Sequence, residues 1–402
     1  MIKETMTKEE RILAAINLEP YDRVPVAPLL NFEYSFRHKG KAVADAYNPL
    51  LTDEGFQATL DLFDEVGGWD GIPLNFSLPL TPKAVPLLAA FYAGPMKYPA
   101  SDPRLNVEAS PQFEEKEIMK AEDYDEITNL GWQGFIDKNY ARFIPGSTDS
   151  SISIPEEART AQAKVLTDRY ISYRDTWQKR GVPVMAGYLL TDPQMLLSLL
   201  RTITQFTLDI HRRPEKVKAA LDTMIGDFIS DPIESMLLAG PPSPTKIPGI
   251  MISCERGSAS YYNLDMFEQF VWPYIKEEVE AWWAAGYVTT LHFDTDWRRN
   301  LPYLLELPRK SCICELDSTT DIFKAKEILG DHMCIMGDVP PALSAYGTPE
   351  EMQAYCQKLI DVVGKDTGFI LSTGCAVPPD TKYENFKMMI DTAKNYPPPR
   401  SN

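Results

Sequence analysis

The stretch LDMFEQFVWPYIKEEVEAWWAAGYVTTLHFD, residues 264–294, decides the fold. Up to Ala285 its apolar residues follow the spacing of an amphipathic helix. The residues from Tyr287 to Leu291 are β-branched, aromatic or apolar, which is typical of a buried strand. We therefore predict a helix over 264–285 and a strand over 287–294, which together make one unit of an α/β fold.

The same unit recurs along the chain. Short apolar runs, each followed by a helical pattern, occupy residues 22–30, 69–76, 182–190, 247–254, 287–294, 310–317, 332–339 and 367–374. Strands that alternate with helices form a parallel sheet. Eight such units favour a closed (β/α)8 barrel, the TIM barrel, over an open doubly wound sheet.

Two segments do not follow this alternation of strands and helices. At the start, Thr7 and Glu10 are spaced as a capping box and predict an N-terminal helix. Residues 77–165 contain no clear strand, and a structureless loop of that length is improbable in a compact domain. We predict that residues 1–402 form a single barrel domain and that 77–165 are a partly helical insertion that caps the barrel mouth, as a lid or docking surface.

The composition describes an acidic globular protein with ample apolar residues for a core. Its net charge of -17 argues against nucleic acid, an anionic membrane or a polyanionic substrate as a partner. Six cysteines in a chain of this length are not a disulfide framework, and the first residues have no apolar segment of the signal-peptide type. We expect a cytoplasmic protein with reduced thiols. The oligomeric state stays open, with a homodimer as one option.

Polar residues collect at the predicted carboxyl ends of the strands, where barrels carry their chemistry. His292, Asp294 and Asp296 alternate along one strand end and therefore share a face. The other predicted strand ends carry Glu255, Glu315, Asp317, Asp338 and Cys375.

Imidazole, carboxylate and thiolate are the usual zinc ligands, so His292, Asp294 and Cys375 are candidates for a metal site across the barrel mouth. Each also has a structural interpretation. A histidine at a strand end is often simply hydrogen-bonded, Asp294 and Asp296 can cap the following turn, and a lone cysteine is often a small buried residue. Glu255 and Glu315 fit either a catalytic or a salt-bridging role.

Several motifs resemble the uroporphyrinogen decarboxylase superfamily. They are the opening TKEERILAAINLEPYDRVPV (7–26) and the segments KAEDYDEI (120–127), MGDVPPALSAYGTPEEM (336–352) and ILSTGCAVPPDTKYENFKMMI (370–390). The resemblance covers nearly the whole chain and is weakest in the insertion. It implies a (β/α)8 barrel of the uroporphyrinogen decarboxylase type.

One branch of this superfamily decarboxylates tetrapyrroles, which it grips with an arginine-rich N-terminal segment. The equivalent stretch here, RVPVAPLLNFEYSFRHKG (23–40), has no arginine cluster around Arg37 and His38. A substrate with many carboxylates is also disfavoured by the negative charge of the chain. A decarboxylase of this type is therefore the alternative, not the first expectation.

The other branch comprises corrinoid-dependent methyltransferases, and the motif around Cys375 is similar to theirs. Those that act on coenzyme M hold zinc with a His-x-Cys pair and a later cysteine, which correspond here to His292, Asp294 and Cys375. The chain departs from that pattern at Asp294, where a carboxylate replaces a thiolate. A harder ligand leaves the zinc more Lewis-acidic and better suited to an oxygen ligand.

The segments HFDTDW (292–297) and CELDSTTDIFKAKEILGDHMCIMGD (314–338) resemble the methyltransferase component of O-demethylases. This implies transfer of a methyl group from a methyl ether, such as a methoxylated aromatic compound, to Co(I), with zinc polarising the ether oxygen and Glu255 or Glu315 delivering a proton or orienting the substrate. The Asp-x-His-x-x-Gly signature of corrinoid proteins is absent, so cobalamin is expected on a separate corrinoid protein. A non-catalytic barrel that binds a small molecule is the further alternative.

Overall fold

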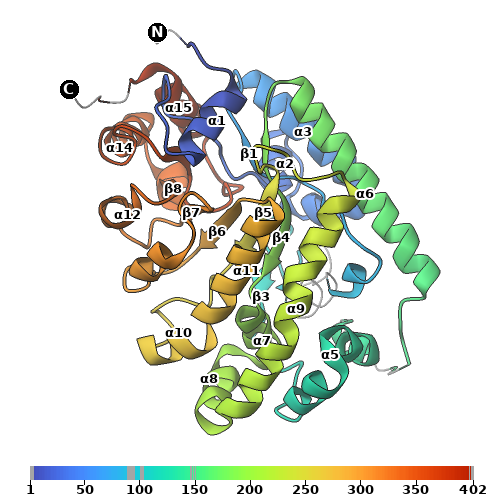
Figure 1. The fold of residues 1–402 in the computed structure, drawn as a ribbon. Coiled ribbons are helices and arrows are strands. Elements are labelled where there is room, and N and C mark those ends of the chain that lie inside the picture. Colours follow the sequence, from blue (N-terminus) through green and yellow to red (C-terminus); the bar gives the residue numbers. More distant parts are fainter. Residues whose placement is uncertain are drawn as a thin grey trace.

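The sheet at the centre of the molecule is parallel and curls into a barrel with helices around it (Figure 1). The structure is a computed structural model, and it describes residues 4–87, 96–99, 104–144, 147, 149, 151–397 and 399. The seven strands of the sheet, in spatial order, are β1 (Ile72–Leu74), β4 (Val184–Thr191), β5 (Gly249–Ser253), β6 (Thr289–Phe293), β7 (Cys312–Leu316), β8 (Cys334–Val339) and β9 (Phe369–Thr373). Seven of the eight predicted strands are confirmed, and the TIM-type barrel follows from them.

The eighth predicted strand, 22–30, is reduced to a single bridge between Val26 and Leu371 of β9. Backbone hydrogen bonds of 2.9 Å join Ala27 N–H to Leu371 O and Leu371 N–H to Pro25 O. On the other side Asp70 N–H, just before β1, donates to Val26 O at 2.7 Å. This segment therefore closes the barrel between β9 and β1, although the prediction of a full strand was wrong. Pro25 and Pro28 lack an N–H group and cannot extend the ladder.

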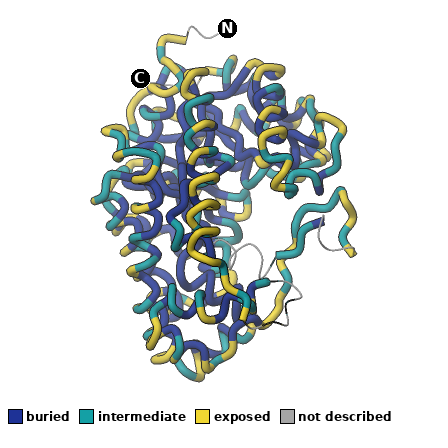
Figure 2. The backbone as a smooth tube through the Cα atoms, turned by 90° about the vertical axis from the view of Figure 1, so that its right-hand side faces the viewer, coloured by how far each residue is buried: buried dark blue, intermediate teal, exposed yellow. Residues whose placement is uncertain are grey.

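The helices surround the sheet and bury its outer face, so exposed residues lie mainly on their outer sides (Figure 2). The α-helices are α1 (Lys8–Ile16), α2 (Phe32–His38), α3 (Thr52–Glu65), α5 (Asp123–Asn139), α6 (Glu156–Lys179), α7 (Pro193–Arg201), α8 (Ile203–Arg212), α9 (Pro214–Leu238), α10 (Leu264–Phe270), α11 (Trp272–Ala285), α12 (Ile322–Leu329), α13 (Pro341–Tyr346), α14 (Pro349–Val362) and α15 (Tyr383–Asn395). Short 3-10 helices are η1 (Val43–Tyr47), η2 (Pro49–Leu51), η3 (Tyr140–Phe143) and η4 (Leu301–Glu306).

Local sequence signals set several of these boundaries. The predicted capping box at Thr7 and Glu10 is present at the start of α1, and Thr348 with Glu351 forms another before α14. The single helix predicted over 264–285 is instead two, because the chain breaks at Val271. Pro273 near the start of α11 explains this break, since a proline ring clashes with the carbonyl one helical turn earlier.

The described part of residues 77–165 holds the strand pair β2 (Met96–Lys97) and β3 (Gln112–Phe113), which is antiparallel, together with α5, η3 and the start of α6. The pair has two residues per strand, too few to leave an alternating pattern in the sequence. The predicted end of the insertion at 165 lies inside α6, which begins at Glu156. Residues 88–95, 100–103, 145, 146, 148 and 150 of the predicted insertion lie outside the described residues.

Candidate metal centre

Three neighbouring strands aim polar side chains at the same point of the barrel mouth. The parallel register places Ser253 of β5 beside His292 of β6, and His292 beside Glu315 of β7. Residues that pair in register share a face of the sheet, so these side chains lie in one row. Asp294 follows β6 and Cys375 follows β9, which brings two further donors to the same end of the barrel.

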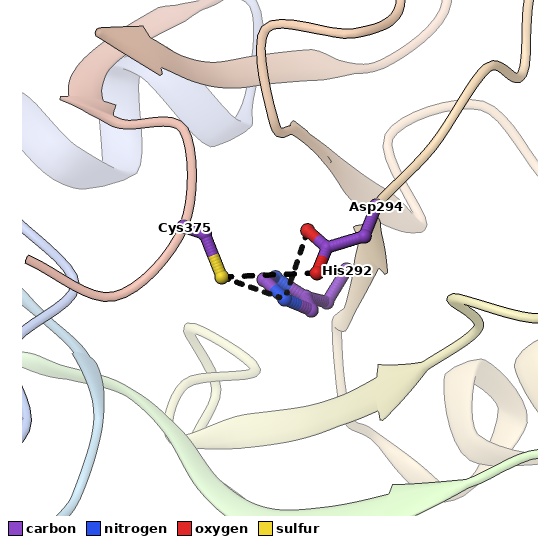
Figure 3. Close-up of side chains that lie close together, drawn as sticks. All are labelled: His292, Asp294 and Cys375. Carbon is purple, nitrogen blue, oxygen red and sulfur yellow. Dashed lines mark hydrogen bonds and ion pairs between the residues drawn. The ribbon is translucent and has the colours of Figure 1, made fainter. Parts of the chain in front are cut away.

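His292, Asp294 and Cys375 converge there, as predicted from the sequence (Figure 3). Cys375 Sγ lies 3.8 Å from both His292 Nε2 and Asp294 Oδ2, and His292 Nε2 lies 3.5 Å from Asp294 Oδ1. One donor atom from each residue falls within 4.8 Å of the other two. This spacing leaves room for one ion between the three atoms; that they bind a metal remains a prediction.

Gly374 allows the thiol to reach this position. A Cβ atom at residue 374 would come within 2.8 Å of the carbonyl carbon of Asp317, in the loop that follows β7. The Gly374 N–H group donates to Val339 O at 2.9 Å, which fixes the start of the loop. Only a residue without a side chain permits this close approach of the two loops, and Cys375 is the next residue.

Glu315 lies behind the imidazole and not beside the space between the three donors. It is 0% exposed, and its Oε2 atom accepts a hydrogen bond of 2.9 Å from His292 Nδ1. This contact keeps a proton on Nδ1, so Nε2 is the ring nitrogen that faces Cys375 and Asp294. Carboxylates commonly hold metal-binding histidines in this way.

Glu255, the other predicted catalytic residue, follows β5 by two positions and is partly buried. Its backbone carbonyl accepts a hydrogen bond from Thr295 Oγ1, and its Oε2 atom is buried without a hydrogen-bond partner. Its negative charge raises the pKa of both Asp294 and Asp192. Glu255 therefore lies close enough to the mouth to act on a bound molecule.

The charges at the mouth are strongly coupled. Burial alone would lower the pKa of His292, but the carboxylate of Glu315 and the hydrogen bond to Cys375 outweigh it and hold this pKa well above its ordinary value. Burial raises the pKa of Asp294 to about 6, against the opposing effect of His292. Burial also raises the pKa of the Cys375 thiol. The mouth therefore holds extra protons that a divalent cation would displace.

The donor set fits zinc. Nitrogen, oxygen and sulfur donors are all represented, and three protein ligands leave a fourth tetrahedral position open, as in catalytic zinc sites. The Oδ1 atom of Asp294 is buried without a hydrogen-bond partner, so it can coordinate an ion without breaking a hydrogen bond. Within the described residues no other group of three such side chains meets the spacing for a metal.

The remaining strand-end residues have structural partners. Asp317 accepts hydrogen bonds from the N–H groups of Thr295 and Thr319, and Asp338 accepts one from the Tyr355 hydroxyl at 2.9 Å. Asp296 forms an ion pair with Arg298, in line with its interpretation as a turn residue. Cys254, Cys312, Cys314 and Cys334 are all buried, as expected of structural cysteines.

Sequence reasoning missed Asp192. This residue follows β4, is 0% exposed, and its Oδ1 atom caps α7 through Met195 N–H at 2.9 Å. Its Oδ2 atom has no hydrogen-bond partner, and burial together with Glu255 raises its pKa to about 7. The Asp-Pro pair at 192–193 was a recognisable helix start, but nothing in it signals burial.

The family model for uroporphyrinogen decarboxylase (URO-D) matches residues 176–396, more than half of the chain. The chain belongs to the uroporphyrinogen decarboxylase family. The matched region includes β4 to β9 and therefore all three candidate ligands.

Individual relatives in the uroporphyrinogen decarboxylase family are more distant. The uroporphyrinogen decarboxylase of Chlorobium luteolum is 33% identical over 142 residues, and that of Chlorobium phaeovibrioides is 31% identical over 142 residues. Each match covers 34% of this chain and 39% of the relative, so the chain matches less than half of either protein's length.

A solved structure of a methyltransferase from Methanosarcina mazei superposes with a TM-score of 0.68. The superposition covers 98% of this chain and 99% of the other, at 17% sequence identity. It shows that the two proteins share one fold over nearly their whole length. None of the helices in the described parts has the length and apolar character required to cross a bilayer.

Proposed function

We propose that this protein is a corrinoid-dependent methyltransferase that transfers the methyl group of a methyl ether, such as a methoxylated aromatic compound, to Co(I) of a separate corrinoid protein. The observation that carries the proposal is the convergence of His292, Asp294 and Cys375 at the barrel mouth. The resemblance of the surrounding motifs to methyltransferases supports it, as does the whole-length likeness to a methyltransferase fold.

The proposed ligands would hold zinc, which when bound supplies a Lewis acid for the ether oxygen. Asp294 and Cys375 would bind the ion as carboxylate and thiolate, and His292 would bind it through Nε2. Glu315 keeps the imidazole in the tautomer that makes this possible, so its role is positioning and not the proton transfer that its sequence position suggested.

Glu255 is the residue that we assign to proton transfer. Breaking the bond between methyl carbon and oxygen leaves negative charge on the oxygen, and a carboxylic acid beside it can neutralise that charge. Its Oε2 atom is not occupied by another hydrogen bond. Glu255 takes up a proton from solvent and passes it to the leaving oxygen while the methyl carbon goes to cobalt, which gives an alcohol or phenol.

The alternative is a decarboxylase of tetrapyrroles, the reaction named for the curated relatives. Such a substrate needs several free cationic groups to bind its carboxylates. Arg37 instead pairs with Glu108 at 3.1 Å and His38 with Glu65 at 2.9 Å, while the mouth itself carries carboxylates. These contacts favour the methyltransferase.

Two measurements test the proposal. The first is metal content, where we expect about one zinc per chain that is lost in His292→Ala and kept in Asp296→Asn, a matched change at a partly exposed carboxylate. The second follows Co(I) to methyl-Co(III) by absorbance with a corrinoid protein and a panel of methoxyarenes. Zinc-free protein with full methyl transfer would overturn the ligand set. Release of coproporphyrinogen from uroporphyrinogen would favour the decarboxylase, and zinc binding without either reaction would favour a non-catalytic barrel.

A further inference from the structure

A pocket lies where the barrel wall is incomplete. β4 has eight residues and β1 has three, and their pairing ends at Leu74 and Ala186. One last hydrogen bond joins Asn75 N–H to Ala186 O, after which the chain leaves the sheet. Residues 188–191 of β4 therefore pair with β5 on one edge only. On their other edge, where a neighbouring strand would lie, there is a pocket of about 560 Å³, a volume that includes space open to solvent. We call it the β4 pocket.

Apolar and aromatic side chains make up most of its wall. They come from β4, from α7 and α9, and from the predicted insertion, and they include Leu80, Leu87, Trp132, Leu190, Leu196 and Phe228. A lining of apolar and aromatic side chains with a few polar groups is typical of a site for a small organic molecule. The insertion thus forms the outer wall of this site.

The charge in the β4 pocket is negative. Asp227 and Asp231 of α9 line it, and among the described residues that line it there is no lysine, arginine or histidine. Asp231 is 4% exposed and pairs with Lys83 at 2.7 Å, but Lys83 is shared with Glu234 at 2.9 Å. Asp227 has no ion pair within the described residues. A ligand that carries a carboxylate would therefore meet unbalanced negative charge in an apolar setting.

The β4 pocket lies two strands away from the candidate metal centre. Thr191 lines the pocket and pairs in register with Ser253, which pairs in turn with His292. Neighbouring strands lie about 4.8 Å apart, so Thr191 and His292 are about 10 Å apart along this row. A molecule with its reacting group at the mouth can therefore extend its remaining part into the pocket.

We infer that the β4 pocket binds the non-reacting part of the methyl donor, and that this part is an apolar ring system that is uncharged or cationic and carries no carboxylate. The inference rests on the proposed function and narrows it from methoxylated compounds in general to those without an acid group.

Direct binding tests this without any turnover. Isothermal titration of the zinc-loaded protein with 2-methoxynaphthalene and with 6-methoxy-2-naphthoate compares two ligands that differ by one carboxylate. We expect the neutral ether to bind at least about tenfold more tightly, the discrimination that one like charge gives in a partly buried site. Equal affinity, or tighter binding of the naphthoate, would overturn the inference.

Two variants locate the binding in the β4 pocket. Ala84→Phe fills space beside the wall and should weaken 2-methoxynaphthalene at least about tenfold. Asp227→Asn removes a negative charge without changing the volume of the side chain, and should reduce the affinity ratio between 2-methoxynaphthalene and the naphthoate several-fold. The control is Glu215→Gln, at an exposed carboxylate on the same helix, which should leave this affinity ratio unchanged. If Ala84→Phe does not fold, the Asp227→Asn result decides. Unchanged affinities in both variants would contradict the placement.

The failure of this inference and that of the proposed function are distinguishable. Tight, pocket-dependent binding of the neutral ether without methyl transfer to a corrinoid protein would overturn the proposed reaction and leave the β4 pocket in place. Methyl transfer that proceeds equally well from both ligands and is unchanged in Ala84→Phe would overturn the inference about the β4 pocket and leave the proposed reaction in place.

Discussion

Glu315 accepts a hydrogen bond of 2.9 Å from Nδ1 of His292, and neither side chain is free to turn. Both residues sit at paired positions of adjacent strands, so the sheet itself sets the distance between them. The imidazole thus presents one fixed nitrogen to the candidate metal centre. The first prediction follows from this contact.

Glu315→Gln should lower zinc affinity about 10- to 100-fold while the fold is retained. Glutamine can still accept from Nδ1–H, but it loses the negative charge that makes the imidazole a better ligand. Competition with a chelator of known affinity gives the measurement. Glu327→Gln, at an exposed carboxylate paired with Lys324, is the control and should bind zinc as the parent does. Equal affinities in both variants would show that Glu315 does not position His292.

Gly374→Ala should displace Cys375 and weaken zinc binding. The added Cβ atom would come within 2.8 Å of backbone in the Asp317 loop, so one of the two loops must move, at a cost of about 1–3 kcal/mol in the free energy of unfolding. Urea unfolding and zinc titration measure the two effects. Gly226→Ala is the matched control, because a Cβ atom there meets nothing within 4 Å, and alanine in the middle of α9 should be neutral or stabilising by up to about 1 kcal/mol.

Asp192 should make stability fall between about pH 4 and pH 7. Burial, with Glu255, raises its folded pKa to about 7, so the folded protein holds a proton that the unfolded chain has already released. The contribution of Asp192 to the free energy of unfolding is therefore largest below its pKa in the unfolded chain. It falls as the pH rises to its pKa in the folded protein, by an amount on the order of 4 kcal/mol.

Asp192→Asn should remove the part of this decline that Asp192 contributes, because asparagine does not titrate but can still cap α7. The raised pKa values of Asp294, Asp231 and Asp338 contribute to the rest. We expect the Asp192→Asn variant to be more stable than the parent at pH 8 and similar to it at pH 4, as measured by urea unfolding. Asp321→Asn, at the exposed N-cap of α12, should show no such crossover. A parent curve that is flat or rising between pH 4 and pH 7 would contradict the prediction.

Much of the barrel could be predicted because its signals are local. Runs of β-branched and apolar residues mark β4 to β9, and Thr7 and Thr348 mark helix starts. Proline chemistry explains the two corrections, at 22–30 and at Val271, and all three prolines involved, Pro25, Pro28 and Pro273, were visible in the sequence. The convergence of His292, Asp294 and Cys375 could be anticipated once a barrel was assumed, because every strand end reaches one mouth.

The features that could not be predicted depend on contacts between distant segments. The pairing of Glu315 with His292 depends on the register between β6 and β7, and the sequence of one strand alone does not determine that register. The burial of Asp192 depends on α7, β5 and the Glu255 loop together. The β4 pocket depends on where β1 ends and on how α5 and α9 pack over the gap, and no motif encodes either.

Asp70→Asn should destabilise the barrel without affecting the metal centre. Asp70 is fully buried, accepts from both Arg11 and Arg23, and also accepts from Val26 N–H in the closing segment. Arg11 keeps its ion pair with Asp22 and Arg23 keeps its ion pair with Glu4, so the cost is that of weakened hydrogen bonds to charged groups, about 1.5–3 kcal/mol. Urea unfolding should show this loss, whereas zinc affinity in the folded protein stays at the parent value. A loss below about 1 kcal/mol, as expected for the surface control Glu327→Gln, would show that the network does not secure the closure.

Asp294→Cys should separate zinc binding from ether cleavage. A second thiolate makes the donor set softer, so zinc affinity should rise, or at least hold, while the ion becomes a weaker Lewis acid toward oxygen. We therefore expect full zinc occupancy with methyl transfer from a methoxyarene at least about tenfold slower, and no comparable loss in Asp296→Asn. Asp294→Asn provides the opposite case, because it removes the charge but keeps the shape, and should lose zinc and activity together. An Asp294→Cys variant that cleaves the ether as fast as the parent would show that the carboxylate is not what adapts this site to an oxygen substrate.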